Sequence, residues 1–120
     1  MLDHIALKVK DFKKSRAFYE AALKPLGYKV LMEFPEGAGF GSPGFPDFWV
    51  GTGIGGTSVH VAFRAQDRKA VDAFYKAALA AGATDNGGPG LRPHYHPHYY
   101  GAFVFDPDGN NIEAVCHTPD

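Results

Sequence analysis

The chain has 120 residues, which suffices for one domain of ordinary size or for two very small modules. The 12 Lys and Arg residues nearly balance the 13 Asp and Glu residues, and there is no block of like charges and no apolar run of roughly 18 residues, which argues against nucleic acid and membranes as partners. Because Lys8 and Lys10 interrupt the first apolar stretch and Cys116 is the only cysteine, we expect a cytoplasmic protein with neither a secretory signal nor a disulfide framework.

The first half of the chain predicts a strand, a helix and three further strands. Residues 2–10 alternate apolar and polar side chains, as a half-buried strand does. Asp11 is placed to cap a helix, and apolar residues at helical spacing continue to Leu26, where Pro25 and Gly27 end the segment. Three short strands separated by Pro and Gly turns follow at 28–34, 37–41 and 47–51.

The second half repeats this order. A shift of 56 positions lays LDHIALKVKDFKKSRAFYEAAL (2–23) over SVHVAFRAQDRKAVDAFYKAAL (58–79) with 10 identities in 22 positions. A weaker match at a shift of 64 makes Glu113 the repeat mate of Trp49. The second half therefore predicts a strand at 58–65, a cap at Asp67, a helix over 70–81, a weak strand near 83–87, and strands at 100–106 and 110–115 joined by a DPDG turn.

The duplication makes the chain one domain, 1–120, built of two modules, 1–56 and 57–120, joined near Gly55 and Gly56. The 15 Gly and 9 Pro residues would be high for an ordinary domain and could indicate disorder. Most of them fall between the short strands, however, so turns are the better interpretation.

The alternation of side chains along the strands indicates which residues face a common cavity. If each helix covers the apolar face of its strands, His4, Trp49, His60 and Glu113 lie on the opposite, concave face. Two imidazoles and a carboxylate form a complete ligand set for a divalent metal with open positions. A single strand His is more often structural, and a Glu beside a turn is more often solvated, but His4 and His60 occupy equivalent positions of the repeat, each two residues before a small Ala.

Three segments resemble the vicinal oxygen chelate superfamily, which includes glyoxalase I, extradiol dioxygenases, bleomycin resistance proteins and fosfomycin resistance enzymes. These segments are LDHIALKVKD with FYEAAL, SVHVAFRA with FYKAAL, and DPDGNNIEAV. The resemblance covers essentially the whole chain. It implies an α+β fold in which two βαβββ modules form a curved, mostly antiparallel eight-stranded sheet around a central cavity, and a reaction in which two neighbouring substrate oxygens chelate a metal.

The ligand positions of the family fall on His4, the Trp49 region, His60 and Glu113. Trp49 cannot coordinate a metal, and Asp47, two residues away, is an alternative ligand. The remaining trio resembles the two-His, one-carboxylate arrangement that suits Fe(II). The resemblance implies a divalent metal, which could be Fe, Mn, Ni, Zn or Co. Extradiol enzymes of this kind usually carry a Tyr near the position of Phe103, which has no hydroxyl to donate.

The segment GPGLRPHYHPHYYGAF (88–103) holds three of the six His residues. It could be a metal site of its own or a plain solvated loop, but we favour an aromatic-rich lid over the pocket. As a lid it would bring Arg92, Tyr99 and Phe103, with Trp49, into contact with the substrate. His96 and Tyr100 would then join Glu113 as candidates for proton transfer. Lys8 and Arg64 are either cations at the pocket mouth or solvated strand ends, and His117 is expected on the surface.

Two functions remain after the sequence analysis. The first is a glyoxalase- or dioxygenase-like metal-dependent enzyme, a lyase or an oxidoreductase, that acts on a small oxygen-rich substrate. The second is a metal-free binding protein of the drug-sequestering type, in which Trp49, Phe103, Phe105 and the loop tyrosines stack on a ligand. A homodimer is expected from the resemblance, with metal sites either within one chain or shared between two.

Overall fold

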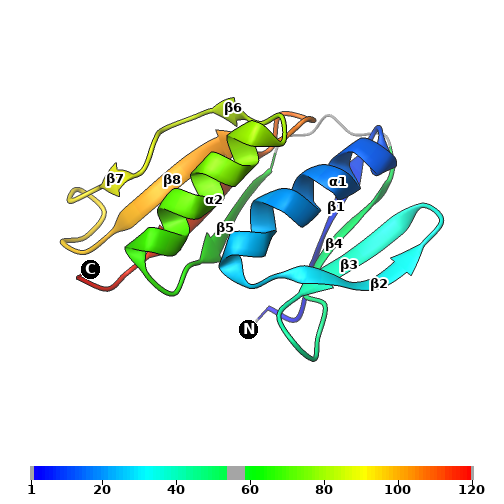
Figure 1. Ribbon diagram of the computed structural model, residues 1–120, viewed down its shortest axis with the longest axis horizontal. Coiled ribbons are helices and arrows are strands. Elements are labelled where there is room, and N and C mark those ends of the chain that lie inside the picture. Colours follow the sequence, from blue (N-terminus) through cyan, green and yellow to red (C-terminus); the bar gives the residue numbers. More distant parts are fainter. Residues whose placement is uncertain (1, 54–58, 120) are drawn as a thin grey trace.

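Two similar modules lie side by side in the computed structural model, which describes residues 2–53 and 59–119 (Figure 1). The first module contains β1 (Ile5–Val9), α1 (Phe12–Leu23), the 3₁₀ turn η1 (Lys24–Leu26), β2 (Lys29–Phe34), β3 (Gly37–Gly41) and β4 (Phe48–Thr52). The second contains β5 (His60–Arg64), α2 (Arg68–Ala80), β6 (Thr84–Asp85), β7 (Gly90–Leu91), β8 (Tyr100–Phe105) and β9 (Asn111–Cys116). The predicted junction near Gly55 and Gly56 lies outside the described residues.

Each module has its own mixed sheet. The strand order is β1-β4-β3-β2 in the first sheet and β5-β9-β8-β6 in the second, with β7 also paired to β8. One pair in each sheet is parallel, β1 with β4 and β5 with β9, and the other pairs are antiparallel. The prediction of a single curved eight-stranded sheet is therefore wrong: within the described residues no backbone ladder joins the two sheets.

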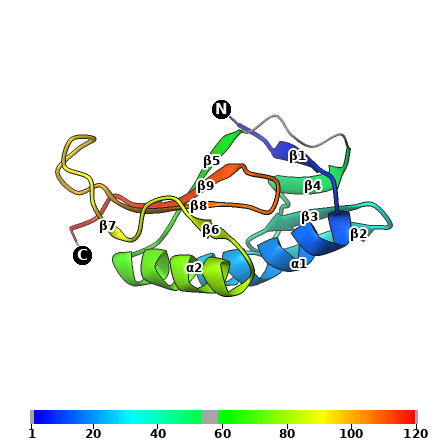
Figure 2. The same cartoon turned by 90° about the horizontal axis from the view of Figure 1, so that it is seen from above.

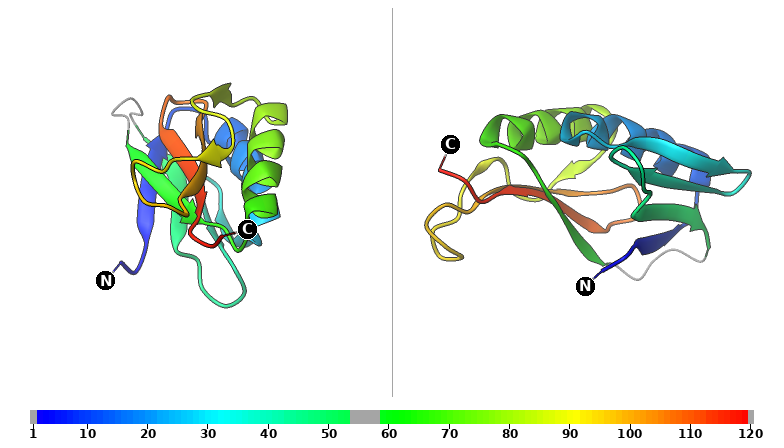
Figure 3. Two further views of the ribbon diagram at one scale, coloured as in Figure 1. Left: turned by 90° about the vertical axis from the view of Figure 1, so that its left-hand side faces the viewer. Right: turned by 90° about the horizontal axis from the view of Figure 1, so that it is seen from below.

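The helices explain this separation. Figures 1 and 2 show α1 and α2 side by side on the same side of the two sheets. The space between the modules is filled by aromatic rings rather than by backbone pairing, because Phe63 of β5 meets the rings of Tyr28 and Phe48 edge-on at 5.5 and 5.1 Å. The uncovered faces of both sheets consequently point to the same side of the molecule, as the two views in Figure 3 also show.

The strand pairing confirms the internal repeat at single-residue register. Ala6 of β1 lies beside Trp49 of β4, and its repeat mate Ala62 of β5 lies beside Glu113 of β9. Trp49 and Glu113 therefore occupy equivalent positions in the two modules, as the shift of 64 predicts.

Local signals in the sequence account for the helix ends. The side chain of Asp11 accepts a hydrogen bond from the Lys14 amide at 3.1 Å, and that of Asp67 accepts one from the Ala70 amide at 2.8 Å, so both predicted caps are confirmed. The second helix begins two residues earlier than predicted because the residue after the Asp67 cap is already helical. Gly27 ends the first helical segment with φ of 86°, a conformation that favours glycine.

The core lies between the helices and the covered faces of the sheets. It is formed mainly by aliphatic and aromatic side chains, and its largest fully buried members include Phe18, Tyr19, Phe40, Phe48, Phe74, Leu23 and Ile112. No helix in the described part of the chain is long and apolar enough to cross a membrane.

A buried polar contact ties the modules together. The hydroxyl of Tyr19 on α1 donates a hydrogen bond to Asp106, in the turn between β8 and β9, at 2.5 Å. The same carboxylate accepts hydrogen bonds from the amides of Asp108 and Asn110 and from the Asn110 side chain, so the DPDG turn is held at the module boundary. Burial and then Asp106 raise the pKa of Tyr19 well above its ordinary value, which keeps the phenol neutral.

Candidate functional site

The second module brings His60 and Glu113 together on neighbouring strands. Nε2 of His60 lies 3.0 Å from Oε1 of Glu113. The Glu113 side chain is only 1% exposed, whereas that of His60 is 48% exposed. A carboxylate this deeply buried requires polar partners, because an unpaired buried charge is costly. The strand alternation predicted this shared face, and the structure confirms it for these two residues.

The contacts of His60 indicate which of its two ring nitrogens carries a proton. Nδ1 lies 3.1 Å from the carbonyl oxygen of Asn111, and because a carbonyl only accepts, Nδ1 carries the proton. In a neutral imidazole Nε2 then presents a lone pair to Oε1 of Glu113, so two acceptors face each other. Either a proton on Nε2 or a metal ion bound by both atoms relieves this repulsion.

The same geometry suits a shared metal ion. Two ligands at about 2.1 Å from one metal, at a right angle to each other, are about 3 Å apart, which is the separation of Nε2 and Oε1. The Nδ1 hydrogen bond to a backbone carbonyl is also the usual way in which a metal-binding His is oriented. His60 and Glu113 therefore fit a divalent metal.

Tyr99 holds the second oxygen of the carboxylate. Its hydroxyl donates a hydrogen bond to Oε2 of Glu113. Its backbone is fixed on both sides, since the Tyr99 amide donates to the His96 carbonyl at 3.1 Å and the Tyr99 carbonyl accepts from the Arg92 amide at 2.7 Å. Burial first, and then the Glu113 carboxylate, raise the pKa of Tyr99. The phenol is therefore a hydrogen-bond donor to Glu113 at neutral pH.

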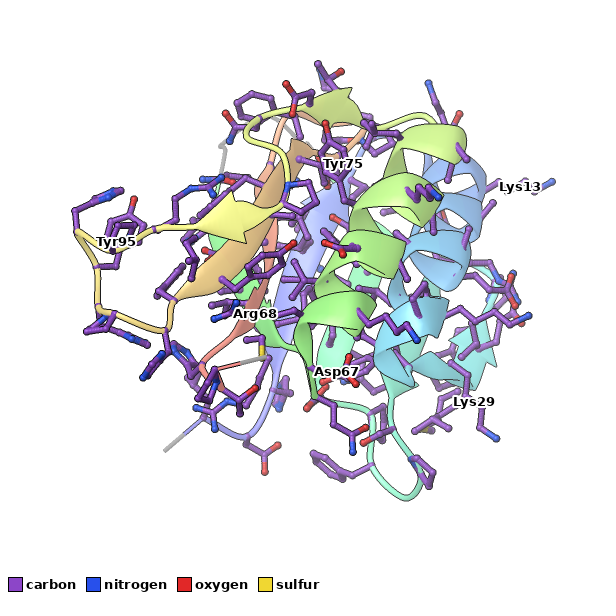
Figure 4. The ribbon with its side chains drawn as sticks, turned by 60° about the vertical axis from the view of Figure 1, so that its left-hand side comes forward. Lys13, Lys29, Asp67, Arg68, Tyr75 and Tyr95 are labelled. Carbon is purple, nitrogen blue, oxygen red and sulfur yellow. The ribbon has the colours of Figure 1, made fainter. Side chains whose placement is uncertain are left out.

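The loop between β7 and β8 lies over this pair, as the lid interpretation predicts for its position. His94, Tyr95 and Tyr99 line a cavity of about 620 Å³ together with His60, Phe103, Asn111 and Glu113. Figure 4 shows Tyr95 on this loop, away from the helices. The imidazole of His60 is stacked on the ring of Phe103 with centroids 6.3 Å apart, and the Arg92 guanidinium lies 5.4 Å from the centroid of the same Phe103 ring.

His96 lies in the middle of the loop sequence but is not among the residues that line the cavity. Its Nε2 is 2.5 Å from Nδ1 of His117, and the two rings are stacked with centroids 4.8 Å apart. Both rings also meet the edge or face of Tyr99, at 5.5 and 5.4 Å. His117 is exposed, as expected, but its contact with His96 was not predicted. The alternation of β9 could have indicated it, because His117 shares the parity of Glu113.

The first module holds the other two predicted residues. His4, which precedes β1, is exposed and contacts Asp3 at 2.8 Å. His4, Lys8, Phe34 and Trp49 line a separate cavity of about 350 Å³ on the uncovered face of the first sheet. Phe48 and Val50 point to the core, so the predicted alternation around Trp49 is confirmed.

The three predicted ligands do not meet within one chain. Among residues 2–53 and 59–119, no three His, Cys, Asp or Glu side chains are close enough to hold a metal ion. The expectation that His4 and the His60–Glu113 pair share one cavity is thus wrong for a single chain. The physical reason is the packing of α1 against α2, which leaves the two sheets open toward the same side instead of facing each other.

Two further candidate residues are held by other side chains. Tyr100 was expected in the pocket, but it faces the helix, where its hydroxyl donates to Asp72 at 2.7 Å and its ring lies under the Arg68 guanidinium. It lies three positions before Phe103, so it has the opposite parity on β8. Asp47, the alternative ligand, is held by the Tyr28 hydroxyl at 2.7 and 2.9 Å from its two oxygens.

Comparison with known proteins agrees with this architecture. Residues 1–114 match the family model described as the Glyoxalase/Bleomycin resistance protein/Dioxygenase superfamily. The chain belongs to this superfamily. No curated protein matches the sequence.

Solved structures of the superfamily are similar over nearly the whole chain. A glyoxalase/bleomycin resistance protein from Albidiferax ferrireducens has 31% identity and a TM-score of 0.84, with 98% of this chain and 99% of that chain covered. A variant of the fosfomycin resistance protein FosX from Listeria monocytogenes, complexed with Mn(II) and 1S,2S-dihydroxypropylphosphonic acid, has 22% identity and a TM-score of 0.72, covering 98% and 90%. Lactoylglutathione lyase from Agrobacterium tumefaciens has 18% identity and a TM-score of 0.71, covering 97% and 92%.

These similarities establish the superfamily and its α+β fold. The superfamily includes metal-dependent enzymes, as the FosX complex with Mn(II) illustrates. At 22% and 18% identity, the last two structures support the fold alone, and the activity of this chain has to be argued from its own residues.

Proposed function

We propose that this protein is a metal-dependent enzyme of the lyase or dioxygenase type, which acts on a small substrate whose neighbouring oxygens chelate the metal. His60 and Glu113 of one chain and His4 of the partner subunit in a homodimer would hold the metal. The observation that carries this proposal is the 3.0 Å separation of His60 Nε2 and Glu113 Oε1, with Nδ1 of His60 already hydrogen-bonded to the Asn111 carbonyl; these two side chains would hold a divalent cation.

The homodimer follows from the incomplete site. His60 and Glu113 supply two ligands, and a two-His, one-carboxylate site needs a third. His4, just before β1, is the only histidine in the sequence of the first module and lines its cavity, so another copy could bring it to the pair. The uncovered faces of both sheets lie on one side of the molecule, so two copies related by a twofold axis could pair the first module of one with the second module of the other.

The bound metal would act as a Lewis acid on the chelated substrate oxygens. The residues of this chain would orient it and handle protons. Asn111 holds the His60 ring through Nδ1, and Tyr99 holds Oε2 of Glu113 so that Oε1 is left for the metal. Phe103 lines the cavity, and Arg92, which is not among the lining residues, lies 5.4 Å from the centroid of the Phe103 ring. Among the residues that line the cavity, Glu113 is the candidate proton acceptor and Tyr99 the candidate proton donor.

A metal-free binding protein is the second candidate. Trp49 at the position equivalent to Glu113 favours it, since indole cannot coordinate a metal. In that case Nε2 of His60 would be protonated and would form an ion pair with Glu113, which satisfies the buried carboxylate without a metal.

Elemental analysis of the untagged protein separates the two candidates. We expect about one divalent metal per chain in the wild type and in His98→Ala, a loop histidine outside the pair, and none in His60→Ala. Glu113→Gln should also lose the metal, although it retains the Tyr99 contact. Metal at 100 times its dissociation constant should stabilise the wild type by about 2.7 kcal/mol. Absence of bound metal, together with no metal-dependent rise in Tm, would contradict the enzyme and leave the binding protein.

A further inference from the structure

The indole of Trp49 lies flat on its own sheet. A Cβ added to Gly39, the residue beside Trp49 on β3, would be 2.8 Å from Cη2 and 2.9 Å from Cζ2 and Cζ3 of the indole. On the other side, β1 contributes the small side chain of Ala6. The row across the sheet therefore consists of a small residue, the large Trp49 and another small residue. The six-membered ring of the indole occupies the space that a side chain at position 39 would need.

Phe34 extends this aromatic surface. Its ring is nearly parallel to the indole, with an interplanar angle of 22° and a centroid separation of 6.5 Å. This geometry is an offset stack, so Phe34 and Trp49 together form one continuous aromatic surface, which we call the aromatic floor. Phe34 is 53% exposed, so its ring is accessible to a ligand.

The floor lies beside a predicted metal ligand. Phe34, Trp49 and His4 line the same cavity of about 350 Å³, a volume suited to a small organic ligand. Trp49 also occupies the strand position that holds Glu113 in the second module. A ring that rests on Trp49 would thus lie next to the metal if His4 binds it.

The second module offers an aromatic group at the corresponding row. Phe103 pairs with Glu113 in register, as Gly39 pairs with Trp49, so Phe103 is the repeat mate of Gly39. Each module therefore carries one aromatic side chain in this row, on alternate strands. The His60 ring stacks on Phe103 in the second cavity.

We propose that the substrate is a planar aromatic molecule whose ring stacks on Trp49. This inference rests on the proposed function only for the position of the metal, since the floor itself is built entirely from the first module. A flat floor of indole and phenyl favours a flat ligand, whereas apolar burial alone would favour a saturated ring of the same size at least as strongly.

The test compares benzyl alcohol with cyclohexylmethanol, which have the same carbon skeleton and hydroxyl group and do not chelate metals. Binding is measured on the intact protein by ligand-observed NMR, and in the wild type also by the emission of Trp49, the only tryptophan. We expect benzyl alcohol to bind roughly two- to tenfold more tightly. The preference should disappear in Trp49→Leu and persist in Phe45→Leu, which removes an exposed phenylalanine outside the cavity.

The His60→Ala variant distinguishes this inference from the metal proposal. A preference for benzyl alcohol that persists in this variant supports the aromatic floor whether or not the wild type holds a metal. Equal binding of the two alcohols, or a preference that Trp49→Leu leaves unchanged, would overturn the inference. Metal bound by the wild type would still support the proposed function in that case.

Discussion

Tyr99 donates its hydroxyl hydrogen bond to one oxygen of Glu113, while His60 approaches the other oxygen of the same carboxylate at 3.0 Å. The tyrosine comes from the loop before β8 and the carboxylate from β9, so the loop positions a residue that we propose as a metal ligand. A partner of a ligating carboxylate usually contributes to metal affinity by fixing the ligand orientation.

The Tyr99→Phe substitution should therefore weaken metal binding. We expect a loss of about 10- to 100-fold in affinity, since Oε2 of Glu113 loses its donor and the carboxylate is free to rotate. Isothermal titration calorimetry with the metal measures the dissociation constant of each variant. Tyr95→Phe is the matched control, because Tyr95 contacts the Tyr99 ring at 4.8 Å but forms no hydrogen bond to Glu113. Equal affinities in both variants would show that the contact does not position the ligand.

Coexpression of His4→Ala and Glu113→Gln chains tests whether metal sites are shared. Each variant alone should hold no metal. If the site takes His4 from the partner subunit, each mixed dimer regains one intact site of two, and random pairing should restore roughly a quarter of the wild-type metal content. The metal content of the purified mixture is the quantity to measure. A mixture as empty as the single variants would contradict a site that takes His4 from the partner subunit.

Tyr19→Phe should destabilise the fold. The lost hydroxyl donates to the buried Asp106 across the module boundary, and a hydrogen bond to a charged group is worth about 1.5–3 kcal/mol. The repeat mate supplies the control: Tyr75 donates to the exposed Asp85, and Tyr75→Phe should cost less than about 1 kcal/mol. Urea denaturation at pH 7 measures both. A Tyr19→Phe variant as stable as the control would show that the two modules do not depend on this contact.

Stability should decrease at alkaline pH. Burial raises the pKa of Tyr19, Tyr28 and Tyr99 in the folded state, and a neighbouring carboxylate raises each further. Above pH 10 these tyrosines lose protons in the unfolded chain but keep them in the folded protein. Because the folded state then binds more protons, the free energy of unfolding falls as pH rises. Denaturation midpoints between pH 8 and about pH 11 should show this, with a shallower decline in Tyr19→Phe.

Gly39→Ala should displace the indole of Trp49. The added methyl group would lie 2.8 Å from the ring, which is closer than atoms can pack, so the indole has to move off the sheet. We expect a destabilisation of about 1–3 kcal/mol and a red shift of the Trp49 emission. Gly37→Ala is the control, since its methyl group would meet only the Val50 carbonyl at 3.6 Å. An unshifted spectrum in Gly39→Ala would argue against the flat floor.

Much of the local structure could be predicted from the sequence. The repeat at shifts of 56 and 64 placed Trp49 and Glu113 at equivalent positions, and the strand register confirms this. The caps Asp11 and Asp67, the DPDG turn and the alternation that directs His60 and Glu113 to one face follow from local chemistry. These features depend on residues that are close in the sequence or on the two-residue alternation of side chains along a strand. Both can be read directly from the amino-acid sequence.

The relation between the modules depended on tertiary structure. Strand alternation indicates which face of its sheet a residue lies on, but not where that face points in the folded chain. His4 was therefore expected beside His60. The packing of α1 on α2 instead leaves the uncovered faces of the two sheets apart (Figure 2). A contact across a large sequence separation, such as that of Tyr19 with Asp106, has no periodic signature. The sequence by itself determined the modules, their register and the face of each candidate ligand, while helix packing and buried hydrogen bonds, which form only in the folded chain, decided which ligands meet.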